Sequence, residues 1–313
     1  MDLNGKLVVL VGGSGFVGRH LAQALLARGV RLRVASRFPE HSLALKPLGN
    51  LGQVQLARCD VRLPESLTRV LTGADAVVNL VGVFAGDLDA VIGKGAGAVA
   101  AAATAAGAGA FVQVSAIGAD PEGTTGYARA KAAGEAAVLA AFPGATVLRP
   151  STLFGPDDNF LNMLAGFTAL PVLPVFAPQA KLQPLFVDDA ALAITNALAD
   201  PAKHGGKTYE IAGPEALTML ELQRRLAAAC GRKPLLVELP DLVSEGIATL
   251  TGWLPGAPLS RQQWLLLQAG NTASSEYPGC AELGVVPRPM GLFLDRWMVR
   301  FRKHGRFAEQ AAV

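Results

Sequence analysis

The chain has 313 residues, 51% of them hydrophobic, and a formal net charge of +3 at pH 7. That length and composition can bury a large core, which argues against a disordered chain and allows one large domain or two modest ones. The small net charge gives no reason to expect a nucleic-acid partner.

The N-terminal segment MDLNGKLVVLVGG predicts a protein that stays inside the cell. It enters a strand at once and has neither a basic region nor a small-residue cleavage site, so we expect no signal peptide. The cysteines Cys59, Cys230 and Cys280 are odd in number and lie far apart, which indicates neither a disulfide framework nor a zinc site. These features favour a reducing, cytoplasmic environment.

The first half of the chain alternates short apolar runs with helical segments. The runs are KLVVLVG, VRLRVAS, VQLARCDV, DAVVNLVGV, AFVQVSA and ATVLRP, and they end at Pro150. This rhythm is typical of a βαβ series, and almost wholly apolar strands indicate a parallel sheet covered by helices on both faces. We therefore predict an α/β fold with a Rossmann-type doubly wound parallel sheet over residues 1–150.

After Pro150 the pattern loosens, which predicts a smaller C-terminal α/β domain over residues 151–313, with some segments free to return to the sheet. GKTYEIAG at 206–213 resembles a strand, and a helix is expected from near Thr218. Two charge-free stretches, 96–119 and 159–180, are rich in Ala and Gly or interrupted by Pro, so neither is expected to span a membrane.

The strongest local motif is the glycine-rich turn VGGSGFVG after the first strand. Glycines let the chain turn sharply and let backbone N–H groups approach a pyrophosphate at the start of the following helix. A strand before it and a helix after it make a purely structural turn the weaker interpretation. The expected dinucleotide contacts in this turn are Gly12, Gly13, Ser14, Gly15, Phe16, Val17 and Gly18.

The end of the second strand indicates which dinucleotide binds. NAD(H) binders typically carry an acid there, whereas this chain has Ser36 and Arg37, and a guanidinium suits the 2′-phosphate of NADP(H). NADP(H) is therefore favoured over NAD(H), although a solvated arginine would look the same. Further along, Asp60 with Val61 could meet the adenine or cap a turn. The segment Leu80, Val81 and Gly82 could border the cofactor or simply pack.

The order of motifs resembles the extended short-chain dehydrogenase/reductase superfamily. The resemblance rests on the glycine turn, on Tyr127 and Lys131 in YARAK, on LRPSTLFGP at 148–156 and on FVDDAALAI at 186–194. A narrower likeness to the atypical branch that contains the nucleotide-binding accessory subunit of respiratory complex I rests on VSAIGAD, QPLFVDDAA, LSRQQWLLLQAGNTAS and WMVRFRKHGRF. The resemblance implies a proton-transfer role for Tyr127, a role for Lys131 in holding the nicotinamide ribose, and a place for Pro150 beside the nicotinamide.

The same resemblance indicates that one residue of the family's catalytic set is missing here. The family commonly places a Ser or Thr as the third of three residues after the fifth strand, and here those residues are Ser115, Ala116 and Ile117. Isoleucine cannot donate a hydrogen bond to a developing oxyanion, so Ser115 is the remaining candidate, although a side chain that points toward the sheet or binds backbone is the favoured interpretation. Thr124 and Thr125 lie on a turn that could be purely structural.

Two functions remain open. One is an NADP(H)-binding scaffold with little turnover, similar to the complex I accessory subunit and peripheral to the inner membrane. The other is an oxidoreductase, epimerase or dehydratase acting on a carbonyl or alcohol of a sugar-nucleotide, steroid-like or quinone-like substrate. No metal site is expected, because the four histidines lack ligand spacing.

The C-terminal segment supplies the candidate contact with a respiratory-complex or membrane-surface partner. Its apolar stripe could dock on such a partner or pack on its own domain. The stripe consists of Leu292, Phe293, Trp297 and Phe301, and the accompanying basic residues are Arg296, Arg300, Arg302, Lys303 and Arg306.

Overall fold

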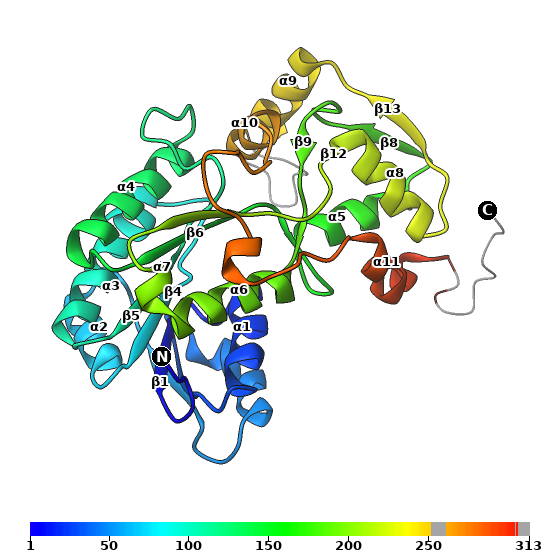
Figure 1. Ribbon diagram of the computed structural model, residues 1–313. Helices are drawn as coiled ribbons and strands as arrows, with labels where there is room; N and C mark the ends of the chain where they lie inside the picture. The colour runs from blue at the N-terminus through cyan, green and yellow to red at the C-terminus, as the bar shows by residue number, and fades with distance from the viewer. Residues whose placement is uncertain (252–260, 304, 306–313) are drawn as a thin grey trace. The chain divides into compact units, whose positions relative to one another are not determined.

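The computed structural model describes residues 1–251, 261–303 and 305. A seven-stranded sheet, parallel throughout, organises the fold, with strand order β11-β6-β5-β4-β1-β2-β3 (Figure 1). The predicted doubly wound α/β fold is confirmed. Its strands are β1 (Leu7–Val11), β2 (Arg31–Ser36), β3 (Val54–Arg58), β4 (Ala76–Asn79), β5 (Ala110–Val114), β6 (Thr146–Pro150) and β11 (Thr208–Ile211).

The strand order reverses between β1 and β4. From β1 the chain adds β2 and β3 on one side, and then returns to add β4, β5 and β6 on the other. In open parallel sheets, ligands bind at the carboxyl ends of strands where the order reverses. The glycine turn follows β1 and Leu80 follows β4, so both lie at this point.

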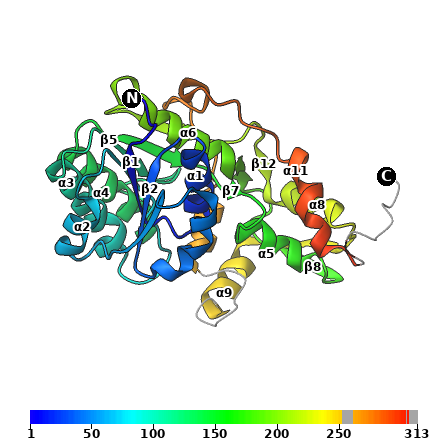
Figure 2. The same cartoon turned by 90° about the horizontal axis from the view of Figure 1, so that it is seen from below.

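Helices cover both faces of the sheet. In Figure 2, α1 and α6 lie on one face, whereas α2, α3 and α4 lie on the other. α4 approaches η2, the turn that precedes α3, closely, since a Cβ at Gly134 would lie 2.2 Å from the carbonyl oxygen of Ile92. The elements are α1 (Phe16–Leu26), η1 (Pro39–Leu48), α2 (Pro64–Leu71), η2 (Asp89–Gly93), α3 (Lys94–Ala105), α4 (Gly126–Ala141), α6 (Val187–Ala199), α7 (Pro201–His204) and η3 (Ala281–Leu283).

The chain divides into two compact units. The first comprises Met1–Pro150, Val187–Ile211 and Ser274–Val286, and the second comprises Ser151–Phe186, Ala212–Ala273 and Pro287–Val313. Two segments after Pro150 thus belong with the sheet, and one of them supplies β11, which pairs with β6. The strand-like GKTYEIAG therefore extends the main sheet, and its consecutive buried residues Tyr209, Glu210 and Ile211 fit a strand with both faces covered.

The second unit contains short helices and two-stranded sheets. Its helix α8 begins where the sequence indicates: Thr218 and Glu221 form a reciprocal capping box. Its elements are β7 (Leu153–Phe154), α5 (Phe160–Phe167), β8 (Val172–Val175), β9 (Lys181–Leu182), β10 (Leu185–Phe186), β12 (Leu217–Thr218), α8 (Met219–Ala229), β13 (Leu235–Glu238), α9 (Asp241–Thr251), α10 (Arg261–Gln268), α11 (Gly291–Trp297) and η4 (Met298–Phe301).

The apolar stripe of the C-terminal segment packs within the second unit. Phe293 in α11 is buried and stacks on Phe186 with ring centroids 3.9 Å apart, and Trp297 stacks on the same ring at 6.4 Å. Of the predicted stripe only Leu292 is largely exposed, so a docking helix that offers Phe293 and Trp297 to a partner does not fit. Arg306 and the ends of both tail motifs lie outside the described residues.

The two charge-free stretches form ordinary elements. Residues 96–119 contain most of α3 and all of β5, and residues 159–180 contain α5 and β8. None of the helices in the described part of the chain combines the length with the apolar character that crossing a membrane requires.

Candidate functional site

The glycine turn between β1 and α1 forms an open backbone cradle. Gly12 has φ +79°, and a Cβ there would lie 3.0 Å from the backbone nitrogen of Val81. A Cβ at Gly18 would lie 2.2 Å from the carbonyl oxygen of Gly13. A Cβ at Gly15 would meet only the Gly12 carbonyl oxygen, at 3.9 Å, and α1 begins at Phe16 without a side-chain cap or an acidic residue in its first turn. The first N–H groups of α1 are therefore available to an anion.

The end of β4 is fixed beside this turn. The Leu80 N–H donates to the carbonyl oxygen of Val11 at 2.8 Å, which keeps β4 paired to β1 beyond the strand end. The Val81 N–H donates to the buried Asn79 side chain at 3.2 Å, and that side chain donates in turn to Gln113 at 2.9 Å. Leu80 and Val81 thus lie at the reversal of strand order, followed by the exposed Gly82.

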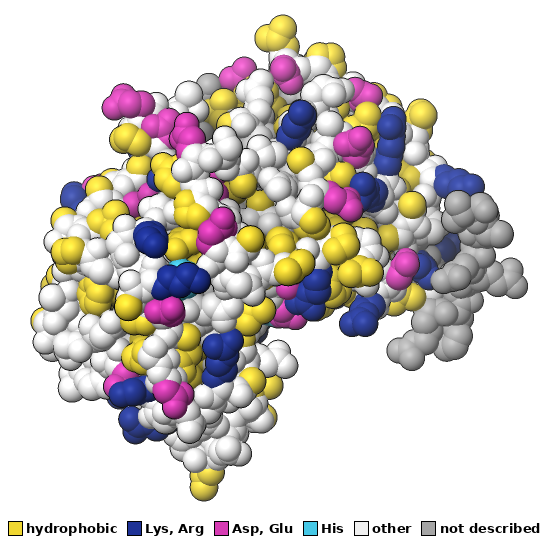
Figure 3. All heavy atoms as spheres, viewed as in Figure 1, with side chains coloured by type: hydrophobic (Ala, Val, Ile, Leu, Met, Phe, Trp, Pro, Cys, Tyr) yellow, Lys and Arg dark blue, Asp and Glu magenta, His cyan; other side chains and the backbone are white. Residues whose placement is uncertain are grey.

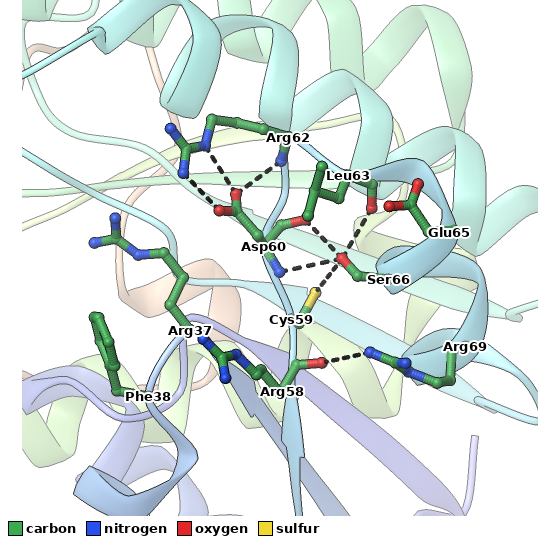
Figure 4. A pocket seen from close by; sticks show the side chains of 10 residues that line it. All are labelled: Arg37, Phe38, Arg58, Cys59, Asp60, Arg62, Leu63, Glu65, Ser66 and Arg69. Atoms are coloured by element: carbon green, nitrogen blue, oxygen red, sulfur yellow. Dashed lines mark hydrogen bonds and ion pairs between the residues drawn. The ribbon is translucent and has the colours of Figure 1, made fainter.

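An arginine-rich pocket of about 440 Å³ opens at the carboxyl ends of β2 and β3. Figure 4 shows the guanidinium groups of Arg37 and Arg62 on the same side of the Asp60 carboxylate. Its lining residues are Arg37, Phe38, Arg58, Cys59, Asp60, Arg62, Leu63, Glu65, Ser66 and Arg69. The predicted Arg37 is therefore one of four arginines around a single cavity.

Asp60 is already bound within this pocket. Its carboxylate accepts two bonds from the Arg62 guanidinium, at 2.6 and 3.0 Å, and a third from the Arg62 N–H at 3.1 Å. These bonds, with the Arg62 side chain the largest cause, lower the pKa of Asp60 to about 2. The turn-capping alternative for Asp60 is thus present, and Val61 beside it is buried against the α3 backbone at Gly95.

Ser36, at the end of β2, carries a buried hydroxyl group. Within the part of the chain that the structure describes, its Oγ has no hydrogen-bond partner. A buried hydroxyl without a partner carries a desolvation cost, so the position suits a ligand that supplies the missing bond.

Three of the pocket arginines were not predicted from the sequence. Arg58 ends β3, Arg62 follows it, and Arg69 in α2 donates to the carbonyl oxygen of Arg58 at 3.4 Å. The signal was present in RCDVRLPESLTR, where arginines recur around Asp60. It could have been interpreted only with the knowledge that β3 lies next to β2 at the same sheet edge.

Tyr127 and Lys131 lie in the first turns of α4. Thr125 caps this helix by accepting a bond from the Ala128 N–H at 3.1 Å, so the structural interpretation of the threonine turn is correct for Thr125. Lys131 is buried, and its Nζ donates to the carbonyl oxygen of Val114 at 3.2 Å. The same Nζ lies 5.8 Å from the centre of the Tyr127 ring. The helix spacing thus brings the two side chains together.

Burial shifts the pKa values of both groups. Desolvation raises the pKa of Tyr127 to about 12 and lowers that of Lys131 to about 8, the latter against a smaller opposing effect of Glu135. Each shift favours the neutral form of its group. A Cβ at Gly82 would lie 3.9 Å from the Lys131 Nζ, so the end of β4 borders this pair.

An exposed aromatic residue covers one face of Tyr127. Phe84, 59% exposed, stacks on the Tyr127 ring with centroids 4.8 Å apart and planes 19° from parallel. It follows the end of β4, and no sequence motif singled it out. The contact restricts access to the Tyr127 ring from that side.

The segment after β5 places Ser115 and Ile117 at the paired edge of β6. The Ser115 N–H donates to Leu148 O at 2.7 Å and the Ile117 N–H to Pro150 O at 3.1 Å. Alternation along an extended chain places both side chains on the same face of the sheet. Ser115 Oγ is buried and, among the described residues, has no hydrogen-bond partner, so it does not bind backbone.

A buried ion-pair network adjoins the Lys131 helix. Glu135, four residues after Lys131, accepts bonds from Arg149 at 2.7, 2.9 and 3.2 Å. Arg149 also lies 3.6 Å from Glu210, and its guanidinium stacks over Tyr277 at 4.8 Å. The network joins α4, β6 and β11, and no spacing in the sequence reveals it.

Other polar residues have local partners. His20 in α1 lies 2.5 Å from Asp188 in the first turn of α6, so this pair joins two helices. Sequence spacing could not indicate this pair, because the two residues are 168 positions apart. Across the described residues there is no cluster of three or more side chains suited to a metal ion.

Comparison with known proteins identifies the family. The model of the NAD dependent epimerase/dehydratase family matches residues 8–212. The chain belongs to this family. It is 31% identical to NADH dehydrogenase [ubiquinone] 1 alpha subcomplex subunit 9, mitochondrial, of Arabidopsis thaliana, over 97% of this chain and 80% of that protein. It is 33% identical to the ceramide reductase of Caulobacter vibrioides, over 75% of this chain and 74% of that protein.

A solved structure shows the same fold. The Citrobacter triphenylmethane reductase complexed with NADP(H) has a TM-score of 0.73 at 19% identity, covering 93% of this chain and 99% of that one. The resemblance that the motifs indicated, both to the extended reductase family and to the complex I accessory subunit, is thereby confirmed.

Proposed function

We propose that the protein binds NADP(H) in preference to NAD(H). The observation that carries the proposal is the pocket of four arginines at the ends of β2 and β3, which suits a 2′-phosphate. Arg37 and the Ser36 hydroxyl are the expected phosphate contacts. Because Arg62 already neutralises Asp60, that carboxylate opposes a phosphate only weakly. The pyrophosphate is expected at the glycine turn, where the first N–H groups of α1 have no side-chain cap.

Titration calorimetry with NADPH and NADH tests this preference. Removing the Arg37 guanidinium in Arg37→Ala should weaken NADPH binding by about 1.5–3 kcal/mol, the usual value of a charge-assisted hydrogen bond, and leave NADH binding nearly unchanged. Arg31→Ala is the matched control, because Arg31 is an exposed residue at the opposite end of the same strand. Equal binding of both nucleotides by the wild-type chain would contradict the proposal.

We further propose that the nucleotide is retained with little turnover, as in an accessory subunit of a respiratory complex. Two features support this role: Ile117 replaces the customary donor, and the pKa of Tyr127 is raised, not lowered. Loss of one oxyanion donor costs a factor on the order of 100 to 1000 in rate. Relatives named as NADH dehydrogenase subunits align along nearly the whole chain. The expected location is the cytoplasm, peripheral to the inner membrane.

Native purification from membranes and cytoplasm tests the accessory role. The expected result is NADP(H) released on denaturation and co-elution with a respiratory complex. Lys131→Ala should lower nucleotide retention, whereas Tyr127→Phe should retain nucleotide and partner alike. A chain that purifies alone and without nucleotide would contradict this assignment.

A reductase is the second candidate, and the buried Ser115 hydroxyl favours it. Ser115 Oγ lies on the same sheet face as position 117 and lacks a partner among the described residues, so it could serve as the donor. When bound, NADPH would supply a hydride to the substrate carbonyl. Tyr127 would donate the proton to the resulting oxygen, and Lys131 would favour ionised Tyr127 and hold the ribose. The ceramide reductase relative adds a lipid-like ketone to the substrates worth testing.

Substrate screening with NADPH distinguishes the two candidates. The panel should include ketones of lipid-like and steroid-like compounds, quinones and sugar nucleotides. Robust substrate-dependent NADPH oxidation that disappears in both Tyr127→Phe and Ser115→Ala would establish the reductase and overturn the low-turnover proposal.

A further inference from the structure

The second unit exposes an apolar sheet face. Strands β8 and β13 pair in parallel, with Val172 opposite Leu235 and Pro174 opposite Val237. Leu173 and Val175, which point to the opposite side, are 2% and 0% exposed and belong to the core. On the outward side Val172 is 49% exposed, Leu235 65% and Val237 38%.

This face departs from the usual pattern of a half-buried sheet. Such a sheet normally carries polar residues on its solvent side, whereas every outward position of this pair is apolar. Leu170, 48% exposed, precedes β8 and adds another exposed apolar side chain. We call Leu170, Val172, Pro174, Leu235 and Val237 the apolar face. A contiguous exposed group of this kind marks an interaction surface.

Basic residues gather at one end of the apolar face. Lys233 is exposed and lies two residues before Leu235. Arg232 donates to the carbonyl oxygen of Phe301 at 3.4 Å, which holds the segment beside Arg302 and the exposed Lys303. The Arg302 side chain is only 14% exposed, so we call the two exposed cations, Lys233 and Lys303, the basic end.

Acidic residues also lie near this surface. Asp295 lies beside the basic end, where it pairs with Arg302 at 3.2 Å, and Glu238 lies at the other end of β13. Figure 3 shows Lys and Arg side chains among hydrophobic and some acidic ones over the region where Figure 1 draws β13 and α8. The charge is therefore asymmetric along the strands, positive where β13 begins.

We propose that the apolar face and the basic end dock together on an anionic lipid surface. A lipid interface rewards apolar side chains that enter the acyl boundary and cations that meet the phosphate headgroups beside it. The surface offers both in one place. Docking uses neither the glycine turn nor the arginine pocket, so it does not depend on the proposed nucleotide function.

Vesicle co-sedimentation of the full chain tests the proposal. The wild-type chain should bind vesicles of phosphatidylcholine with phosphatidylglycerol, and bind phosphatidylcholine alone much more weakly. Added salt should reduce the binding, because it screens the headgroup attraction. The double variant Val172→Gln with Leu235→Gln, which keeps the charge, should lose at least about tenfold in partitioning. Lys233→Gln should lose about fivefold on anionic vesicles only.

Matched controls separate docking from general surface effects. Leu51→Gln changes a fully exposed apolar residue of the first unit, and Lys207→Gln removes an exposed charge there, so both should bind as the wild-type chain does. A cooperative thermal unfolding transition close to that of the wild-type chain should persist in every variant, which verifies folding. The proposal would be overturned if the wild-type chain did not bind anionic vesicles, or if the controls lost as much binding as the variants. It would also be overturned if the chain remained bound to membrane proteins after detergent had removed the lipid.

Discussion

The buried Lys131 should make stability depend on pH in an unusual direction. Its Nζ is desolvated in the folded chain, which lowers its pKa from the ordinary 10.5 to about 8. Between these values the unfolded chain binds the proton and the folded chain releases it, so the free energy of unfolding rises with pH. The full difference corresponds to about 3 kcal/mol. Replacing Lys131 by Met removes the ionisable group and therefore removes this rise.

Urea unfolding of the nucleotide-free chain from pH 7 to pH 10 measures the effect. The quantity to compare is the unfolding free energy of the wild-type chain minus that of Lys131→Met, because contributions of other groups, such as Tyr127 with its raised pKa, largely cancel. We expect this difference to grow by roughly 2–3 kcal/mol over the range. Lys207→Met, at an exposed lysine, should give a flat difference. A flat difference for Lys131→Met as well would refute the argument that Lys131 is desolvated.

Three further predictions follow from the first unit. Glu135→Ala should destabilise the chain by about 3–5 kcal/mol in urea unfolding, since it leaves Arg149 buried without its main partner; Glu65→Ala at the pocket rim should change stability by less than about 1 kcal/mol. Gly12→Ala should abolish NADPH binding and cost more stability than Gly52→Ala, because both glycines have positive φ but only Gly12 has neighbours within 4 Å. Phe84→Ala should increase quenching of Tyr127 fluorescence by acrylamide in a variant that keeps Tyr127 as its sole tyrosine and lacks tryptophan; unchanged quenching would contradict the stacked arrangement.

The sheet was predictable because its information is local. The apolar runs that became β1, β4, β5 and β6 consist almost entirely of buried residues, and the glycine turn needs only its own residues and the strand before it. β11 was recognised as a strand, but the sheet it joins depends on packing against β6, which lies about sixty residues earlier in the chain. Local pattern does not determine such distant pairings.

The site residues likewise divide into those that local sequence predicts and those that depend on distant packing. Tyr127 and Lys131 meet because helix spacing fixes them, so the sequence was sufficient for that pair. The grouping of Arg58 and Arg62 with Arg37 depends on the alignment of adjacent strands, which the sequence does not reveal. The contact of Glu135 with Arg149 likewise depends on the packing of α4 beside β6. The C-terminal stripe shows the converse: its spacing predicts an apolar helix face equally well whether that face contacts a partner or the aromatic cluster around Phe186.

Tyr127 and Lys131 differ in how far each contributes to the structure itself. Lys131 donates to the β5 carbonyl of Val114 and lies close to Gly82 and the Glu135 carboxylate, so it links α4 to the sheet whether or not a substrate exists. Tyr127 has desolvation as the single cause of its raised pKa and, among the described residues, no hydrogen bond to its hydroxyl. Removing that hydroxyl should therefore cost little stability and little nucleotide affinity, and its remaining use is proton transfer. Lys131→Ala is expected to weaken nucleotide binding under both candidate functions. Tyr127→Phe therefore separates turnover from binding more cleanly than any change at Lys131.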